Sequence, residues 1–442
     1  MTPAEFFVKY QREMIDYDKA FGAQCFTKDH FVLMADWTYK AIQDVKIGDK
    51  VIGYDNTVNI VTQVFRSMKK VRHIRTDLCD LYVTEDHPFY YKNGIFMPAI
   101  ELASNIPAIY DKEHFSRSGL TDNELLFLGF WLGDGNISKH HDGRTDEIKI
   151  TYGMQKRDFV RSLGIISTER AHHDTPGSFV ASIRKTEHPI LTDMIINHCA
   201  GEYKKLPLIF SNRESALIIE GLIKSDGSPK HSSFVVTNTS PSLLYSIQAM
   251  CINLGYKTKA VRLSRRKSDC IRIKGKLVKS VKPLYRLTIA EKNNHFSFGY
   301  ADILEETEAE VYNLETDGTH TYICNNYKVH NCVDVFRQYC RDVIGCPHTG
   351  AVDGAKDLWF RFIDNDEKKY FNRFNALQAK YGDVLIEDGT PSNKWGHVSI
   401  VVTPLPDKEH ALVFQQNGLD QKGGEFAIRN IKNALGVLRR KP

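Results

Sequence analysis

Three consecutive residues, His330, Asn331 and Cys332, have side chains that together can cut a peptide bond. An Asn side-chain amide can attack its own backbone carbonyl, close a succinimide and cleave the chain after itself. That reaction is slow unless a neighbour protonates the departing amine, and His330 is adjacent. The Cys332 thiol can carry an acyl group while the chain is cut. An isolated His-Asn-Cys triplet is more often an ordinary loop, so its interpretation depends on other signals.

Motifs in a fixed order along the chain accompany this triplet and resemble those of inteins, which are self-splicing protein inserts. The resemblance implies an insert of 307 residues that begins at Cys25 and ends at Asn331. Residues 1–24 and 332–442 would then be the two parts of a host protein of 135 residues. The motifs are Cys25–Thr27, Ile47–Val51, Thr84–Pro88, Val311–Leu314, Thr319–Tyr322 and Val329–Cys332.

The resemblance assigns the first reaction step to residues near the start of the insert. Cys25 would accept the backbone acyl group of Gln24 and form a thioester. Thr84 and His87, which match the Thr-x-x-His motif of the family, would polarise that peptide bond and protonate its nitrogen. A lone His is more often a structural residue, but the surrounding motifs favour the catalytic interpretation of His87.

The same resemblance assigns the later steps to residues at the end of the insert. Cys332 would capture the acyl group, and Asn331 would cyclise with His330 as its proton donor. A shift from sulfur to nitrogen would then leave a peptide bond between the two host segments. His320 lies where the family often has an assisting His, while Asn313 stands where the family frequently has Asp. Splicing of this kind needs no cofactor.

The length and cysteine content bound the classes of protein to be considered. A chain of 442 residues holds about three domains. We expect synthesis in the bacterial cytoplasm, because no apolar run approaches the roughly 20 residues of a membrane span and no signal peptide is recognisable. Nine cysteines without a Cys-x-x-Cys pair argue against a disulfide framework and a zinc site. A reducing compartment also keeps Cys25 and Cys332 as free thiols.

Two further patterns lie in the first quarter of the chain, on either side of the start of the insert. Residues 25–117 contain short alternating apolar runs separated by Gly, Asp and Asn, which predicts β-strands. The resemblance implies that this segment closes with residues 290–331 into an all-β, horseshoe-shaped splicing domain. The host segment before the insert begins with a predicted helix from Pro3 to about Ile15, because apolar residues recur there at helical spacing.

A repeated pattern in residues 118–255 predicts two similar helices. Each copy has a capping box, an apolar run, two small residues four apart and a terminal acid followed by Gly. Small residues at this spacing let two helix backbones approach closely, which would bring Asp134 and Asp226 together at the helix ends. The copies are Thr121–Gly135, with Gly129 and Gly133, and Ser211–Gly227, with Gly221 and Ser225.

Carboxylates at two neighbouring helix C-termini would repel each other and the helix dipoles unless a cation lay between them. Mg²⁺ is a hard divalent ion that suits such a site, and it can activate water against a phosphodiester. The alternative is that Asp134 and Asp226 each simply end a helix. Duplication of the whole pattern favours the metal site.

The two copies resemble the LAGLIDADG homing endonucleases that are commonly nested in inteins. The resemblance implies an α+β domain that lays paired β-sheets in the major groove of double-stranded DNA. Lys204–Pro207 resembles the Lys-x-Pro block of that family, which makes Lys205 the candidate basic catalytic residue. Both acids are present, which favours an intact nuclease over a decayed one.

A basic segment, residues 256–289, follows the repeated helices. Within it, residues 257–286 carry twelve Lys or Arg against one acid, Asp269, and apolar residues alternate with the charges. A charge run is more often a solvated face, but this alternation favours basic β-strands that face phosphates. The candidate DNA contacts are Arg265, Arg266, Lys267, Arg272 and Lys274.

Joining Gln24 to Cys332 creates the run Gly22-Ala23-Gln24-Cys332-Val333-Asp334, which is followed by Lys356–Trp359, Tyr381–Leu385 and Trp395–Val401. These segments resemble CHAP domains, which are papain-like α+β peptidoglycan hydrolases found in many phage lysins. The resemblance implies that Cys332, at a helix start, is the nucleophile and that His397 on a later strand is its base. A third residue should orient the His. Asn417 is the first candidate for this role, and Gln415, where the family often has Glu, is the second.

Three acids near the joined nucleophile, Asp16, Asp18 and Asp334, form a candidate Ca²⁺ loop with backbone oxygens of Ala20 and Gly22. Some CHAP lysins look similar at this place. A solvated acidic turn is an almost equally good interpretation. Neither this loop nor the Cys-His triad is complete until splicing joins the two host segments.

The sequence therefore predicts a multidomain, monomeric precursor with three folds: an all-β horseshoe, an α+β endonuclease and a split α+β papain-like domain. Its partners would be double-stranded DNA and bacterial peptidoglycan, without membrane contact, and the phage-type host protein would act on the cell wall. The alternative is a multidomain protein that never splices, with an endonuclease decayed to DNA binding. The predicted boundaries are 1–24, 25–117, 118–255, 256–289, 290–331 and 332–442.

Overall fold

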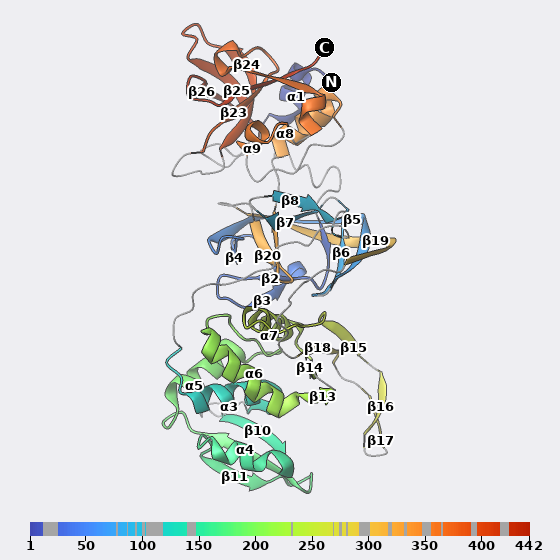
Figure 1. Ribbon diagram of the computed structural model, residues 1–442, viewed down its shortest axis with the longest axis vertical. Coiled ribbons are helices and arrows are strands. Elements are labelled where there is room, and N and C mark those ends of the chain that lie inside the picture. Colours follow the sequence, from blue (N-terminus) through green and yellow to red (C-terminus); the bar gives the residue numbers. More distant parts are fainter. Residues whose placement is uncertain are drawn as a thin grey trace.

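A computed structural model gives the fold of most of the chain (Figure 1). Among the described residues, no helix is long and apolar enough to span a membrane. The structure describes residues 1–11, 25–76, 78–85, 87–92, 95–99, 102, 118–138, 147–230, 233–267, 269–273, 276–279, 282–290, 301–316, 321–330, 334–346, 355–363, 366–389, 396–415 and 424–442.

The first domain is built of β-strands from both ends of the insert, as expected. One sheet has the strand order β19-β1-β6-β5-β4, and the other has the order β3-β2-β20-β21-β7-β8. The strands are β1 (Phe26–Thr27), β2 (Phe31–Leu33), β3 (Tyr39–Ala41), β4 (Lys50–Ile52), β5 (Val58–Thr76), β6 (Asp80–Val83), β7 (Pro88–Lys92), β8 (Ile95–Pro98), β19 (Ala301–Thr316), β20 (Thr321–Cys324) and β21 (Tyr327–His330), with one 3-10 turn, η1 (Ile42–Asp44).

The long strands β5 and β19 hold the two ends of this β-domain together. They pair antiparallel from Val61 opposite Thr316 to Thr76 opposite Ala301. Residues more than 200 positions apart in the sequence therefore share one ladder, and the β-domain closes around an insertion. The sequence pattern alone predicts no strand as long as β5, because its second half carries charged residues on both faces.

The second domain is α+β and contains an internal duplication. Helices α3 and α6 each run directly into the edge strand of a four-stranded sheet, β9 after α3 and β13 after α6. The elements are α3 (Asp122–Asp134), β9 (Gly135–Ser138), β10 (Glu147–Gly153), η3 (Met154–Lys156), α4 (Arg157–Ser162), β11 (Thr168–Ala171), β12 (Ser178–Ile183), α5 (Pro189–Asp193), η4 (Met194–Cys199), α6 (Asn212–Asp226), β13 (Ser228–Lys230), β14 (Ser233–Asn238), α7 (Pro241–Asn253), β15 (Arg262–Arg265) and β18 (Leu284–Ala290).

The boundary predicted after residue 255 is wrong, because strands β15 and β18 complete the second sheet of this domain. That sheet has the order β13-β14-β18-β15, with β14 and β18 antiparallel along their length. The hairpin β16 (Cys270–Ile273) and β17 (Lys276–Lys279) forms a separate two-stranded sheet. Figure 1 shows this hairpin as an arm beside the domain.

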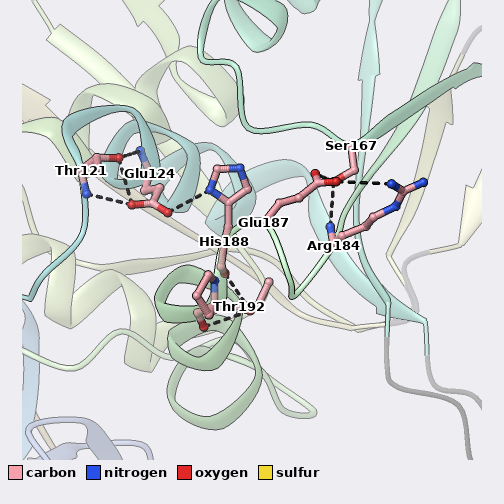
Figure 2. Close-up of polar contacts among 8 residues, drawn as sticks. Thr121, Glu124, Ser167, Arg184, Glu187, His188 and Thr192 are labelled. Atoms are coloured by element: carbon pink, nitrogen blue, oxygen red, sulfur yellow. Dashed lines mark hydrogen bonds and ion pairs between the residues drawn. The ribbon is translucent and has the colours of Figure 1, made fainter.

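Both predicted capping boxes start their helices. Thr121 accepts a hydrogen bond from the backbone of Glu124, whose carboxylate accepts one from the backbone of Thr121 at 2.9 Å. Ser211 and Glu214 repeat this arrangement. In Figure 2 the Glu124 carboxylate also contacts the Nδ1 atom of His188 at 3.0 Å, which anchors the start of α5 to the start of α3. A neighbouring group in the same figure ties Glu187 to Ser167 and Arg184.

Helices α3 and α6 pack backbone against backbone, as the small residues predict. A Cβ atom at Gly129 would lie 2.0 Å from the carbonyl oxygen of Ile218, and one at Gly221 would lie 2.0 Å from that of Leu126. Any side chain at these positions would push the helices apart. The glycines therefore set the distance between the two acidic C-terminal ends.

The third domain joins the two host segments in one core. Helix α1 (Pro3–Tyr10) buries Phe6 and Phe7 against Tyr339 and Phe414 of the C-terminal segment. Its sheet has the order β22-β27-β23-β24-β25-β26. The other elements are α8 (Asp334–Tyr339), η5 (Cys340–Ile344), α9 (Asp357–Phe360), η6 (Asp366–Lys369), β22 (Phe371–Phe374), η7 (Ala376–Gln378), β23 (Val384–Glu387), β24 (His397–Pro404), β25 (His410–Gln415), β26 (Glu425–Asn430) and β27 (Gly436–Arg440).

The first helix is shorter than predicted. It ends at Tyr10, because Gln11 is extended, with φ −65° and ψ 124°, and forms a parallel bridge to Gly424. The sequence pattern predicts a helix to about Ile15, and Ile15 itself lies outside the described residues. A tertiary contact with the C-terminal segment thus overrides the local helical pattern.

Candidate functional sites

The first candidate site surrounds the backbone of Cys25. The Cys25 N–H donates to the Thr84 hydroxyl oxygen at 2.9 Å, and the Thr84 N–H donates back to the Cys25 carbonyl at 3.0 Å. Both residues are buried. Because the Cys25 nitrogen belongs to the Gln24–Cys25 peptide bond, the Thr84 hydroxyl touches the bond that the sequence predicts to be cut.

His87 lies fully buried beside this pair. Its backbone N–H donates to the Thr84 carbonyl at 3.2 Å, which closes a tight turn after β6. Its ring packs against Phe26, with ring centroids 4.1 Å apart. The turn therefore holds the imidazole next to the residue that follows Cys25.

The other end of the insert reaches the same place. Strand β21 pairs with β7, with Val329 opposite Phe89, so the backbone of His330 runs opposite Pro88 and next to His87. The side chain of His330 and the predicted residues His320, Asn331 and Cys332 lie outside the described part of the structure. Two chain positions about 240 residues apart thus pair within one β-domain.

Asn313, which stands where the intein family frequently has Asp, is fully buried on β19. Its side-chain oxygen accepts hydrogen bonds from the Leu314 N–H at 2.9 Å and the Tyr322 hydroxyl at 3.2 Å. A neutral amide suits this buried position, because an ionised carboxylate there would lose its hydration.

The second candidate site lies where α3 and α6 end. A Cβ atom at Gly133 would lie 3.0 Å from the carboxyl carbon of Asp226, so the two helix ends touch. Burial, and then the negative charge of Asp134, raise the pKa of Asp226 to about 6. The structure therefore brings together the two acids that the repeat singles out.

Two lysines accompany the acids, and neither is the predicted Lys205. Lys156 pairs with Asp134, with 2.5 Å between Nζ and Oδ2. Lys204 donates from Nζ to the carbonyls of Trp131, Leu132 and Gly133 at 2.8, 2.9 and 3.0 Å. Its burial lowers the pKa of the ammonium to about 8, although both acids oppose this shift.

The sequence predicts Lys205 as the basic catalytic residue, whereas the structure places its neighbour Lys204 against the last turn of α3. The side chain of Lys205 is exposed, while its backbone N–H donates to the Cys199 carbonyl at 2.8 Å. The Lys-x-Pro motif selected Lys205 of the two adjacent lysines, and the sequence gave no signal for Lys156.

An open cavity of about 900 Å³ adjoins these groups. Both halves of the duplicated domain contribute to its wall. Its polar lining includes Asn136, Lys204, Asp226, Thr237, Asn238 and Thr239.

The acids suit a hard divalent cation. Within the described part of the chain, Asp134 has an ion pair to Lys156, whereas Asp226 has none. No group of three or more His, Cys, Asp or Glu is found among the same residues. Mg²⁺ is commonly held by one or two carboxylates, with water and substrate phosphates as further ligands. The donor set therefore fits the expected ion.

The candidate DNA contacts lie at the end of β15 and beyond it. Arg265 ends β15, and the side chains of Arg266 and Lys267 are exposed just before the hairpin β16–β17. Arg262 at the start of the strand instead forms an ion pair with Asp80 of the β-domain, with 3.4 Å between Nε and Oδ2. The Arg272 side chain and Lys274 lie outside the described residues.

The third candidate site lies on β24 and β25 of the split domain. His397 is half-buried and contacts Gln415, with 2.9 Å between Nε2 and Oε1. The same Gln415 oxygen accepts from Arg429 at 2.8 Å, and the Gln415 amide donates to Glu425 at 2.9 Å. Burial and the charge of Arg429 lower the pKa of His397 to about 4.

These contacts fix the tautomer of His397. Arg429 can only donate and the Glu425 carboxylate only accepts, so the Gln415 oxygen must face Arg429 and His397. The His397 Nε2 atom is then the proton donor, which leaves Nδ1 as the acceptor for a thiol. Sequence reasoning had preferred Asn417, which lies outside the described residues, and it missed Arg429 and Glu425.

The remaining predicted residues of this domain lie outside the description. Cys332, Asp16 and Asp18 are not among the described residues, and the side chain of Asp334 is not described either. The backbone of Asp334 begins α8, so the predicted helix start follows Cys332 by two residues.

A comparison with family models assigns the start of the β-domain. Residues 25–87 match the model described as Hom_end-associated Hint. The matched segment begins at Cys25 and ends at His87, and it contains the Cys25–Thr84 contact. The all-β domain that the sequence predicts to begin at Cys25 is therefore confirmed as a Hint-like domain over this segment.

Among curated proteins, the chain is 24% identical over 266 residues to the ATP-dependent DNA helicase Hel308 of Thermococcus kodakarensis. The match covers 51% of this chain and 23% of the helicase, so the chain spans less than a quarter of that relative. The helicase activity of the relative is therefore not carried over to this chain.

Three kinds of solved structure are similar to parts of the chain. Mesophilic variants of the homing endonuclease I-DmoI match 38% of this chain and 88% of theirs, at 18% identity and a TM-score of 0.27. The gp41-1 intein matches 70% of this chain and 98% of its own, at 10% identity and a TM-score of 0.20. The bacterial intein-like domain from Clostridium thermocellum matches 70% and 100%, at 12% identity and a TM-score of 0.21.

Proposed function

We propose that the chain is a protein-splicing precursor that excises residues 25–331 and joins Gln24 to Cys332. The observation that carries this proposal is the contact of the Thr84 hydroxyl with the Cys25 nitrogen, at the place where strand β21 delivers the other end of the insert. A structural β-scaffold has no need for both ends of a long insertion to meet at a buried Cys, Thr and His.

The chain's own residues account for the first step. The Cys25 thiol attacks the Gln24 carbonyl, and the C–N bond to Cys25 breaks as the thioester forms. The leaving nitrogen takes a proton, and His87, which is buried with its ring against Phe26, is the acid–base group proposed to supply it. Thr84 holds that nitrogen in place through its hydroxyl.

The test is the intact mass of the protein after expression in a reducing cytosol. Wild-type protein should yield a 307-residue insert and a 135-residue ligated product. A Cys25→Ala, Asn331→Ala double variant should stay a single chain of 50.5 kDa. A wild-type chain that also stays whole would favour the alternative, a multidomain protein that never splices.

We further propose that the α+β domain is a homing endonuclease of the LAGLIDADG type that cuts double-stranded DNA. The contact between the ends of α3 and α6, which places Asp134 beside Asp226 at an open cavity, supports this function. The exposed basic residues after β15 and the hairpin arm would extend the DNA contact. Cleavage of DNA that requires both acids would exclude the decayed, DNA-binding alternative.

Mg²⁺ bound at this domain would supply an activated water and charge neutralisation at the scissile phosphate. Asp134 and Asp226 would hold it, and Lys204 would keep the last turn of α3 in place through its three carbonyl contacts. Lys156 balances the charge of Asp134.

We propose that the ligated host is a CHAP-type hydrolase of bacterial peptidoglycan, encoded by a phage and acting on the cell wall after synthesis in the cytoplasm. Two observations support it: both host segments share one core, and His397 has a fixed tautomer suited to a thiol nucleophile. The test uses the 135-residue host chain encoded already joined, which should release soluble fragments from purified cell walls, whereas its Cys332→Ser variant should not. The candidate Ca²⁺ loop is tested by chelation of the same product.

A further inference from the structure

A fully buried polar network joins helix α7 of the α+β domain to the β-domain, and Gln248 lies at its centre. The Gln248 side-chain oxygen accepts from the Asn326 amide at 2.9 Å, and its nitrogen donates to the Leu78 carbonyl at 2.9 Å. Gln248 and Asn326 are both 0% exposed. The inserted domain thus supplies a side chain to the interior of the β-domain.

Each of the two contacts falls on a turn that leads into a predicted splicing residue. Asn325 and Asn326 form the turn between β20 and β21, with φ of 48° and 67°, and β21 ends at His330. Leu78 lies in the turn between β5 and β6, and β6 runs directly into Thr84. One amide of Gln248 therefore bridges the strand that carries Thr84 and the strand that carries His330.

Further groups of the inserted domain support the same two turns. The Tyr245 carbonyl accepts from Asn326 at 3.3 Å, and the Val261 N–H donates to the Leu78 carbonyl at 3.2 Å. Val261 also forms an isolated parallel bridge with Cys79. The apolar core is continuous across this boundary, because buried residues of both domains belong to one cluster.

The β-domain also ties the two turns together by itself. The Tyr327 hydroxyl donates to Thr76 at 2.9 Å, Cys79 hydrogen-bonds to the Asn325 side chain, and the Tyr39 hydroxyl bonds to Asn326. Without Gln248, the Asn326 amide would lose the nearer of its two acceptors and the Leu78 carbonyl would keep the Val261 N–H, in a buried region where lost hydrogen bonds are costly.

We propose that Gln248 is a positioning residue for splicing, and that the inserted domain is therefore an integral part of the splicing machinery. Helix α7 holds the turn before β21 in register with the turn before β6, so that the two ends of the insert meet in reactive geometry. Small displacements of reacting groups reduce rates strongly, which makes the excision rate sensitive to this contact. The inference rests on the proposed splicing function.

The test compares two full-length precursors, Gln248→Met and the matched control Gln155→Met. Met keeps the length of Gln but removes its polar atoms, and Gln155 is an exposed residue of the same domain. We expect the Gln248 variant to form ligated product about tenfold more slowly, while the control splices as the wild type does. Both excised inserts should bind and cut DNA equally, which global misfolding of the Gln248 variant would not allow.

Gln248→Leu in the full-length precursor provides a second variant if Gln248→Met is insoluble. Slow splicing of the soluble Gln248→Leu precursor supports the inference, because Leu makes neither of the two hydrogen bonds of the Gln248 amide. Splicing at the wild-type rate by either variant overturns it. A wild-type precursor that fails to splice overturns the proposed function instead, so the two failures are distinguishable.

Discussion

The backbone nitrogen of Cys25 lies 2.9 Å from the hydroxyl oxygen of Thr84. Thr84→Val keeps the shape of the side chain and removes this contact, so we expect thioester formation at Cys25 to fall about 10- to 100-fold. Cleavage at Cys25 by an added small thiol, followed by intact mass, measures that step alone. Thr84→Ser retains the hydroxyl and should stay close to wild type. Undiminished thiol cleavage in the Val variant would remove Thr84 from the mechanism.

Asp226 should show opposite effects on stability and on nuclease activity. The folded state raises the pKa of this carboxyl from its ordinary value of 3.8 to about 6, so the folded protein binds a proton more tightly than the unfolded chain does. The ionised carboxylate therefore destabilises the fold above about pH 6, and stability rises as pH falls from 6 towards 4. Asp226→Asn should stabilise the protein by about 1–3 kcal/mol at pH 7.5 and abolish DNA cleavage.

Thermal unfolding with and without Mg²⁺ checks this prediction. The wild type should gain stability on adding Mg²⁺, whereas Asp226→Asn should gain less because one ligand is gone. Asp174→Asn, a change of the same kind at an exposed position, is the control. It should alter neither the thermal stability nor the gain in stability on adding Mg²⁺. A destabilised Asp226→Asn protein would mean that the carboxylate is compensated by a contact other than a metal ion.

Adjacent lysines should differ sharply in effect. Lys204→Met leaves three carbonyls of the last turn of α3 without their shared donor, which should cost about 1–3 kcal/mol and reduce DNA cleavage at least tenfold. Lys205→Met, at the exposed residue that follows, should change the free energy of unfolding and the rate of DNA cleavage only slightly. Urea unfolding and a plasmid cleavage assay give the two quantities. Equal losses in the two variants would contradict the inward placement of Lys204.

The contrast between these lysines shows where sequence reasoning ends. Capping boxes and small residues predicted α3, α6 and their close packing because those signals are local and repeated. Which of Lys204 and Lys205 points inward depends on a backbone bond to Cys199. No local sequence pattern predicts this hydrogen bond.

The same limit applies to contacts between domains. Gln248 looks like an ordinary polar residue of an apolar helix, and only the fold places it against Asn326. The sequence of β15 and β18 is typical of a separate basic segment. Their place in the sheet depends on the pairing of β18 with β14 and of β15 with β18, which joins residues far apart in the sequence. The sequence motifs predicted which residues carry reactive groups. The residues that support those groups are identified only by the contacts that the fold makes between distant segments.

The split domain yields the last prediction, which concerns Gln415. Its oxygen accepts from both His397 and Arg429, so it orients the imidazole without a charge of its own. Gln415→Leu in the ligated product should lower hydrolysis of cell walls about 10- to 100-fold, because the His397 ring loses its orienting partner. Gln415→Glu places a carboxylate at the same ring nitrogen and should raise the pKa of His397 from its depressed value of about 4.

The pH profile of kcat/KM separates this role from a packing role. With Glu at position 415 the acid limb of the profile should move to higher pH, because the protonated imidazole is then favoured over a wider range. The Leu variant should lose activity across the profile without that shift. Ile428→Ala, a change at an exposed residue of the edge strand β26, is the control and should leave the profile in place. An unchanged acid limb in the Glu variant would show that the His397–Gln415 contact does not govern the catalytic base.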